Sequence, residues 1–298
     1  MLSRLGWCVS LALLGVCVAG ARESASRGAA AASIGVSGPL FIIGGASKPR
    51  AMMERFLDLA GGVSARIVVV PAASRDPELA GELFVEEMEQ IGAGSLEVTA
   101  RTREEALETA SVEQVAAADA VYFTGGDQSR LHDVLAGTEF LEAVRALHRR
   151  GGVVAGTSAG AAVMGALMLT GEEADVPEGE DHFARLRPGV IETREGFGFW
   201  PEAVVDQHFL ARRRNNRLLS VVLDRPELLG VGIDESTAVV VRGGVVEVVG
   251  VGNVVVYDAR RAEVADGAGG GGELHRAQGV VMHVLGPGER WRFVEDGE

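Results

Sequence analysis

A serine between glycines is the first feature of this chain that could do covalent chemistry. Residues 153–160 read VVAGTSAG, a short apolar run followed by small residues. The apolar run predicts a buried strand, and the small residues predict a sharp turn into a helix. Such a turn exposes Ser158 as a nucleophile, and Gly156 and Gly160 leave room for it. The N–H of Ala159 would then point to a developing oxyanion, so the segment indicates acyl transfer, although a tightly packed turn needs the same glycines.

A serine hydroxyl becomes nucleophilic when a base takes its proton, and the base is usually a histidine oriented by a carboxylate. Among the six histidines, His208 stands where a short strand gives way to a helix, the same kind of sheet edge that carries Ser158. Glu235 occupies the corresponding end of the next strand. Asp206 and Asp234 are rivals for the role of orienting acid, and spacing alone leaves that choice open.

A different chain order would point to a different enzyme class. In α/β-hydrolases the serine is followed by the acid and then by the histidine. An esterase of that class would need an acid such as Asp258, followed by His275 or His283 as the base. His283 lies in an apolar strand where packing explains it, so the order Ser158, His208, Glu235 is the stronger hypothesis.

The elements that position these residues alternate between apolar runs and amphipathic stretches, which predicts an α/β fold with a mostly parallel sheet flanked by helices. Strands are expected at 40–43, 65–70, 96–98, 120–123, 153–155, 203–205 and 229–233, and helices at 49–60, 77–91, 104–118, 140–149 and through 212–219. Short valine-rich runs after residue 236 predict an antiparallel C-terminal part. The acidic stretch 171–194 is expected to be a surface excursion near the site.

Bulk composition excludes some classes of function. The chain has 298 residues, 47% of them hydrophobic, and a formal net charge of -14. Such an acidic chain has no basic run interleaved with aromatic residues, which argues against nucleic acid as a partner.

The N-terminal residues predict export. An arginine precedes an apolar segment that is too short to span a bilayer and that ends in small residues, which is typical of a signal peptide over residues 1–20. Residues 21–38 read as a disordered lead-in, and 39–298 as a single domain with a β-rich C-terminal part. Cys8 and Cys17 lie within the signal, so a secreted or periplasmic mature chain would have no disulfide and no thiolate metal site.

Four ordered motifs carry a family resemblance. They are FTGGDQ at 123–128, GTSAGA at 156–161, DQHF with spaced arginines at 206–218, and GIDESTA at 232–238. Together, within about 40–257, they resemble the cyanophycinases of serine peptidase family S51. The resemblance implies a class I glutamine-amidotransferase-like (flavodoxin-like) fold, a homodimer, and an enzyme that uses no cofactor and no metal.

The resemblance also implies roles for individual residues. Ser158 would be the nucleophile, His208 the base and Glu235 the orienting acid. The N–H of Ala159, with that of Gly126 or Asp127, would form the oxyanion hole. The residues implied to hold the substrate are Gln128, Asp206, Gln207, Arg212, Arg214 and Arg217.

The implied substrate is cyanophycin, a poly-aspartate backbone with an arginine on each β-carboxyl group, which the family releases as β-aspartyl-arginine dipeptides. A carboxylate such as Asp206 would match the substrate guanidinium, and the arginines at 212–217 would match its carboxylates. The chain departs from the family in the acidic stretch 171–194, in the glycine-rich loop 267–272 and at Gly165, where relatives often carry serine. None of these departures removes Ser158, His208 or Glu235.

Two other functions remain open from the sequence. One is an aspartyl dipeptidase of the same family, which would need a closed pocket for a free amino terminus. The other is a protein that keeps the fold and binds the polymer without cleaving it. The occurrence of serine, histidine and glutamate together favours catalysis over simple binding.

Overall fold

The computed structural model describes residues 37–173, 183–265 and 274–293. All of them belong to one compact unit, 34–298. The predicted signal peptide, almost all of the predicted lead-in, the loop 267–272 and part of the acidic stretch lie outside the described residues. Within the described part of the chain, no helix combines the length and the apolar character that a membrane crossing needs.

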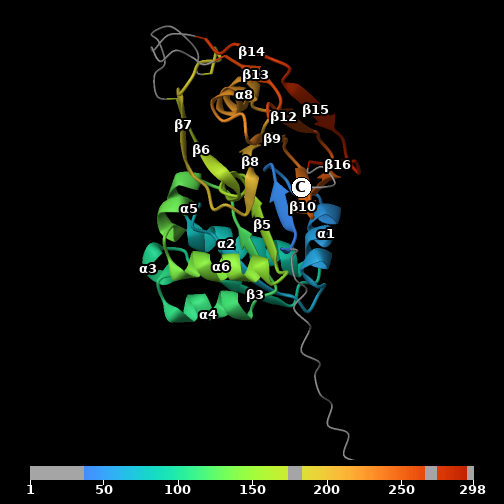
Figure 1. The fold of residues 1–298 in the computed structure, drawn as a ribbon. Coiled ribbons are helices and arrows are strands. Elements are labelled where there is room, and N and C mark those ends of the chain that lie inside the picture. Colours follow the sequence, from blue (N-terminus) through green and yellow to red (C-terminus); the bar gives the residue numbers. More distant parts are fainter. Residues whose placement is uncertain (1–36, 174–182, 266–273, 294–298) are drawn as a thin grey trace, which may run out of the picture. The chain divides into compact units, whose positions relative to one another are not determined.

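An eight-stranded sheet forms the centre of the fold (Figure 1). Its parallel part consists of β1 (Leu40–Ile43), β5 (Val153–Thr157), β4 (Ala120–Phe123), β2 (Arg66–Val70) and β3 (Ser95–Val98). Three antiparallel strands extend it beyond β1, namely β10 (Thr237–Arg242), β11 (Val245–Gly250) and β16 (Arg290–Arg292). The central strands are continuous apolar runs because both faces of the sheet are covered. The predicted α/β class is confirmed.

Helices cover both faces of this sheet. Met52 and Phe56 of α1 (Arg50–Ala60) and Phe84 of α2 (Pro77–Glu89) pack on one face. On the other face lie α4 (Thr109–Ala117), α5 (Gln128–Leu135) and α6 (Glu139–Arg149). The short helices α3 (Arg103–Ala106) and α7 (Ala159–Ala162) complete this part of the fold.

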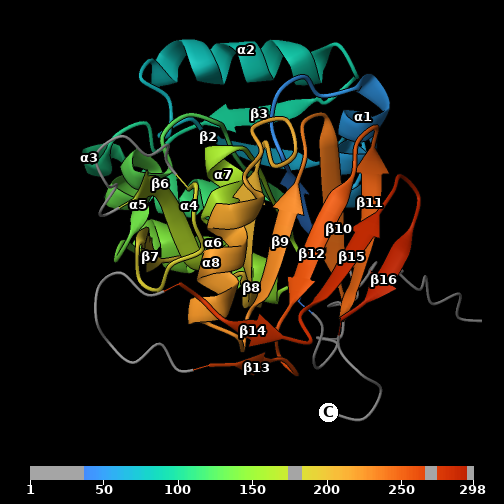
Figure 2. The ribbon, with the colours of Figure 1, turned by 90° about the horizontal axis from the view of Figure 1, so that it is seen from above.

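A second, six-stranded sheet was not apparent from the sequence. Its order is β15 (Val281–Leu285), β12 (Val254–Asp258), β9 (Leu229–Ile233), β8 (Trp200–Gln207), β6 (Gly165–Glu173) and β7 (Ile191–Glu195). The neighbours β6, β8 and β9 are parallel, and the others pair antiparallel. One face packs on the first sheet, and the other is covered by α8 (Asn215–Asp224) (Figure 2). A small ribbon, β13 (Glu263–Val264) with β14 (Ala277–Gln278), lies apart from both sheets.

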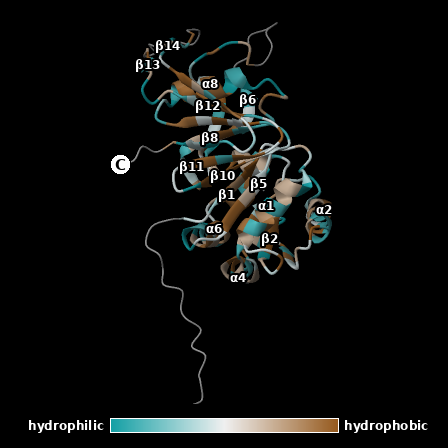
Figure 3. Ribbon diagram, turned by 90° about the vertical axis from the view of Figure 1, so that its right-hand side faces the viewer, coloured by the Kyte–Doolittle hydropathy of each residue, from teal (hydrophilic) through white to brown (hydrophobic). Residues whose placement is uncertain are grey.

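Two predicted boundaries were wrong. The stretch 171–194 is not all surface excursion, because β6 runs into it and β7 begins within it. The helix expected through residue 212 begins only at Asn215, since His208 and Arg213 have positive φ angles of 50° and 54° that end a regular helix. The central strands of both sheets are strongly hydrophobic (Figure 3), so hydropathy alone could not assign such a strand to one sheet or the other.

Candidate active site

Ser158 lies on a tight turn between β5 and α7, with φ 52° and ψ -107°. A Cβ atom on Gly156 would lie 2.5 Å from the carbonyl oxygen of Gly160, and one on Gly160 would lie 2.4 Å from that of Phe123. Neither position can carry a side chain without moving the backbone. The strained turn predicted around this serine is therefore present, and it leaves the hydroxyl group partly exposed.

The structure brings Ser158, His208 and Glu235 together. The Ser158 hydroxyl lies 3.0 Å from His208 Nε2, and His208 Nδ1 lies 2.7 Å from Glu235 Oε1. If Nδ1–H donates to the carboxylate, Nε2 is left to accept the proton of the serine hydroxyl. This arrangement can activate the serine for attack on a carbonyl carbon.

The rival acids have other partners. Asp234 Oδ1 accepts a hydrogen bond from the N–H of Ala211 at 2.9 Å. The Asp206 carboxylate, only 1% exposed, forms an ion pair with Arg217. Glu235 is therefore the carboxylate that the fold places against His208.

The residues of the esterase alternative are not gathered at Ser158. His275 lies beside Asp224, with 3.5 Å between Nε2 and Oδ1. His283 packs on Trp291, with ring centroids 4.8 Å apart. Asp258 pairs with Arg260. The second enzyme class considered for the sequence thus lacks its acid and base at the serine.

Burial is the main influence on the His208 imidazole, and it lowers the pKa of that group below the ordinary value of 6.5. The hydrogen bond to Glu235 acts in the opposite direction, while the charges of Arg212 and Arg214 lower the pKa further. The neutral form, which is the one that can accept a proton, is thus favoured at neutral pH.

This pKa shift predicts the acid side of the pH profile. Activity requires neutral His208, so it should fall as the pH drops through the lowered pKa, with a midpoint of kcat/KM below 6.5. Steady-state rates between pH 4 and 8 measure that midpoint. Reversing the charge in Arg212→Glu should move it upward, because a cation that disfavours the imidazolium is replaced by an anion. A wild-type midpoint above 6.5, or one that Arg212→Glu leaves in place, would contradict this prediction.

One of the three N–H groups predicted for the oxyanion hole is unavailable. The N–H of Asp127 donates to the carbonyl of Ala73 at 2.8 Å, and the Asp127 side chain accepts from the N–H of Ser129 at 2.8 Å, at the start of α5. The assignment of Asp127 was therefore wrong, because the turn uses its N–H internally. Gly126 and Ala159 remain candidates.

Gly126 must be a glycine. Its φ is 145°, and a Cβ atom there would lie 2.1 Å from the carbonyl oxygen of Ala73. The preceding residue, Gly125, is close enough to Ser158 that a Cβ at Gly125 would lie 3.4 Å from the serine Cβ. The glycine turn after β4 thus passes directly beside the serine.

Asp206 does not face outward to a ligand, contrary to prediction. Its two oxygens accept hydrogen bonds from Arg217, one from Nε at 2.8 Å and one from Nη2, and Arg217 is itself 4% exposed. Arg214 lies 3.7 Å from the same carboxylate. The ring of Phe183 covers Arg217 at 5.6 Å, a contact that no sequence pattern indicated because Phe183 lies in the unpatterned stretch 171–194. Asp206 therefore holds arginines in place.

The remaining predicted binding residues differ in whether their polar groups already have hydrogen-bond partners within the protein. Arg214 Nη1 donates to the carbonyl and to Oε1 of Gln207, at 2.6 and 2.9 Å, and burial lowers the pKa of Arg214 to about 10. Gln207 Oε1 lies 3.5 Å from the Ser158 hydroxyl. Gln128 donates to the carbonyls of residues 169 and 170 in β6. Arg212, in contrast, is exposed.

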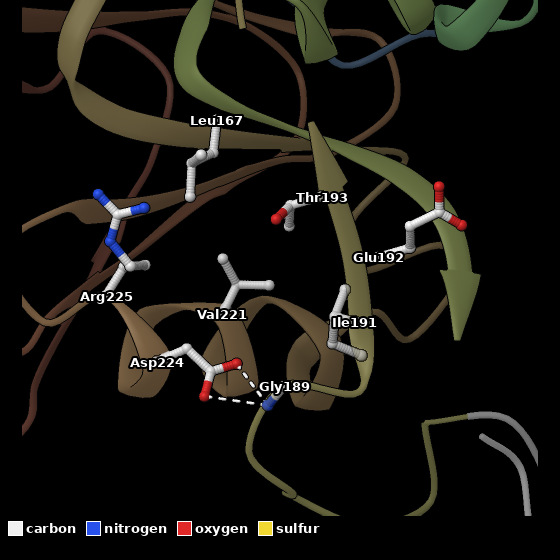
Figure 4. Close-up of a pocket in the computed structure, with 8 residues that line it drawn as sticks. All are labelled: Leu167, Gly189, Ile191, Glu192, Thr193, Val221, Asp224 and Arg225. Carbon is white, nitrogen blue, oxygen red and sulfur yellow. Dashed lines mark hydrogen bonds between the residues drawn. The ribbon is translucent and has the colours of Figure 1, made fainter. Parts of the chain in front are cut away.

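A separate cavity of about 440 Å³ lies between β6, β7 and α8 (Figure 4). Leu167, Ile191 and Val221 give it apolar walls, and Asp224 at its lower edge in the figure accepts the N–H of Gly189 with both oxygens, at 3.2 and 3.0 Å. None of the predicted site residues lines this cavity. It is distinct from the place where Ser158 and His208 meet.

Comparison with known proteins agrees with the geometry. A sequence model of peptidase family S51 matches residues 40–249. A cyanophycinase of Geminocystis herdmanii is 37% identical over 262 residues, which cover 85% of this chain and 92% of that protein. A cyanophycinase of a Nostoc species is 35% identical over 264 residues, covering 86% of each chain. A peptidase structure from an acI-B1 actinobacterium superposes with a TM-score of 0.63 at 23% identity, over 87% of this chain and 98% of that one, and so shares the fold. The chain belongs to peptidase family S51 and is a peptidase.

Proposed function

We propose that this peptidase hydrolyses cyanophycin to β-aspartyl-arginine dipeptides through an acyl-enzyme on Ser158. The observation that carries the proposal is the hydrogen-bonded line from Ser158 through His208 to Glu235, at 3.0 and 2.7 Å. The substrate class is supported by the relatives, which are cyanophycinases covered over most of their length.

The proposed reaction has two steps. In the first, Ser158 Oγ attacks a backbone carbonyl carbon as His208 takes the hydroxyl proton, and the N–H groups of Gly126 and Ala159 stabilise the oxyanion. The C–N bond then breaks, and His208 gives its proton to the departing amine. In the second step His208 activates a water molecule, which hydrolyses the ester and restores the serine.

Substrate recognition is proposed to rest on the arginine cluster. Asp206 fixes Arg217, and Arg214 in turn fixes Gln207 beside the serine, so this group shapes one wall of the site. The exposed Arg212 is left to bind a carboxylate of the substrate. Secretion or a periplasmic location, and assembly into a homodimer, belong to the same proposal. Export would place the enzyme where an insoluble polymer released by other cells can be reached.

Loss of Arg212 should affect substrate capture more than turnover. Arg212→Ala is expected to raise KM for soluble cyanophycin fragments about tenfold, equivalent to about 1.4 kcal/mol, with kcat little changed. Arg213→Ala is the matched control, because Arg213 is a neighbouring arginine on the same loop. Steady-state kinetics on both variants give KM and kcat. Equal increases of KM in the two variants, or a lower kcat in Arg212→Ala with KM unchanged, would contradict the assignment.

Incubation with insoluble cyanophycin tests the function itself. The mature protein and its Ser158→Ala variant are mixed with the washed polymer, and the soluble products are identified by mass spectrometry. Release of β-aspartyl-arginine by the wild type alone is the expected result. If both proteins sediment with the polymer and neither releases product, the non-catalytic binding alternative is favoured. If only short peptides that begin with aspartate are cleaved, the dipeptidase alternative replaces the proposal.

A further inference from the structure

The last residue of β1 and the two residues after it tie the three proposed catalytic loops to one another. The carbonyl of Ile43 accepts the N–H of Ser158 at 3.0 Å, and the carbonyl of Gly44 accepts the N–H of His208 at 2.8 Å. The carbonyl of Gly45 accepts the N–H of Ser236, directly after Glu235, at 2.9 Å. Three successive carbonyl groups therefore hold the backbone of the serine, the histidine and the acid loop.

This arrangement matters because the site is built from two sheets. Ser158 follows β5 of the eight-stranded sheet, whereas His208 follows β8 of the six-stranded sheet. Glu235 lies in the connection from β9 of the second sheet to β10 of the first. The distance between the serine hydroxyl and the imidazole thus depends on how the two sheets are connected at this point. The carbonyl groups of residues 43–45 provide that connection through hydrogen bonds.

Gly45 also lies directly against the reacting edge of the imidazole. A Cβ atom at this position would lie 2.4 Å from both Cε1 and Nε2 of His208, and 3.1 Å from Cδ2. Nonbonded atoms cannot lie this close together, so either the ring or the backbone would have to move. Nε2 is the atom that faces the Ser158 hydroxyl, so a methyl group at Gly45 would push the ring at the point where proton transfer takes place.

We propose that Gly45 is a positioning residue, whose bare backbone sets the place of the His208 ring against Ser158. The inference rests on the proposed serine mechanism and adds a residue to it. The backbone of Gly45, at φ 111°, accepts the N–H of Ser236 through its carbonyl group. Because Gly45 has no Cβ atom, it also leaves room for the imidazole of His208. A side chain at this position would meet the imidazole ring and displace it relative to Ser158.

The test is the variant Gly45→Ala, measured first with a fluorophosphonate, which phosphonylates an activated serine with loss of fluoride. Displacement of the ring should slow labelling of Ser158, and lower kcat, roughly 100-fold, with KM within threefold of wild type. Gly62→Ala is the control, because Gly62 also has a positive φ, 81°, but a Cβ atom there would have no neighbouring atom within 4 Å. Gly62→Ala should carry a similar backbone strain and keep wild-type labelling.

A double-variant cycle distinguishes displacement of the His208 ring from a general loss of stability. In a His208→Ala background the imidazole is gone, so Gly45→Ala should lower the unfolding temperature no more than Gly62→Ala does. In the wild-type background Gly45→Ala should lower it more. If Gly45→Ala alone fails to fold, a folded Gly45→Ala/His208→Ala variant supports the inference, and failure of both overturns it.

The outcomes also separate this inference from the proposed mechanism. A wild-type enzyme in which the fluorophosphonate does not react with Ser158 would overturn the serine mechanism, and the role of Gly45 with it. A reactive wild type whose Gly45→Ala variant reacts equally fast would overturn the role of Gly45 alone. Equal losses of stability in both histidine backgrounds would do the same.

Discussion

The variant Ser158→Ala is expected to lose roughly four to six orders of magnitude in kcat while it keeps its fold and binds substrate. The loss is this large because serine, histidine and acid act as one unit, so removing the nucleophile removes nearly all of their joint effect. What remains would come from the oxyanion site and from binding. Steady-state release of dipeptide, with sedimentation of protein and polymer as the binding measurement, gives both numbers.

The matched control is Ser47→Ala. Ser47 is an exposed serine near the site, and its hydroxyl lies 3.0 Å from that of Ser236, so this variant removes a comparable hydrogen bond without touching His208. It should keep activity within a few-fold of wild type. Comparable losses in both variants, or a Ser158→Ala enzyme that retains more than about one percent of wild-type kcat, would rule out an acyl-enzyme on Ser158.

The strand pattern predicted that Ser158 and His208 meet at one site with a nearby acid, because each stands at the end of an apolar strand. It left the acid open among Asp206, Asp234 and Glu235, and the family resemblance selected Glu235. Strand ends can be read from hydropathy, and the carboxyl edge of a parallel sheet is where ligands bind. What could not be read is that these strands divide between two sheets. The apolar cores of β5 and β8 are both short and buried, so periodicity does not distinguish their sheets.

The errors at Asp206 and Asp127 have a common physical cause. Both residues were expected to offer a polar group to the substrate, and in each case the protein itself occupies that group: Arg217 pairs with the Asp206 carboxylate, and Ala73 accepts the Asp127 N–H. A buried polar group needs a partner, but its partner is fixed by tertiary packing and not by local sequence. Residue type can therefore locate a site while leaving open which groups face the ligand.

The same occupied carboxylate leads to a large expected change in stability. Replacing Asp206 with alanine leaves the guanidinium of Arg217, only 4% exposed, without its bidentate partner. Removing one member of a buried ion pair costs about 3–5 kcal/mol, because the remaining charge stays desolvated. For a chain of this size that corresponds to a fall in unfolding temperature of about 10 °C, measurable by calorimetry or circular dichroism.

Two further variants test whether the stability lost in Asp206→Ala comes from the buried ion pair. Glu227→Ala breaks the Arg225–Glu227 pair, whose side chains are 48% and 56% exposed, and should cost less than about 1 kcal/mol. The double variant Asp206→Asn/Arg217→Met removes both charges of the Asp206–Arg217 pair and should recover at least half of the stability lost in Asp206→Ala. If Asp206→Ala cost no more than Glu227→Ala, the carboxylate would have to be free to bind a ligand after all. The arginines at 214 and 217 would then need another anchor, and Gln207 would no longer be fixed beside the serine through Asp206.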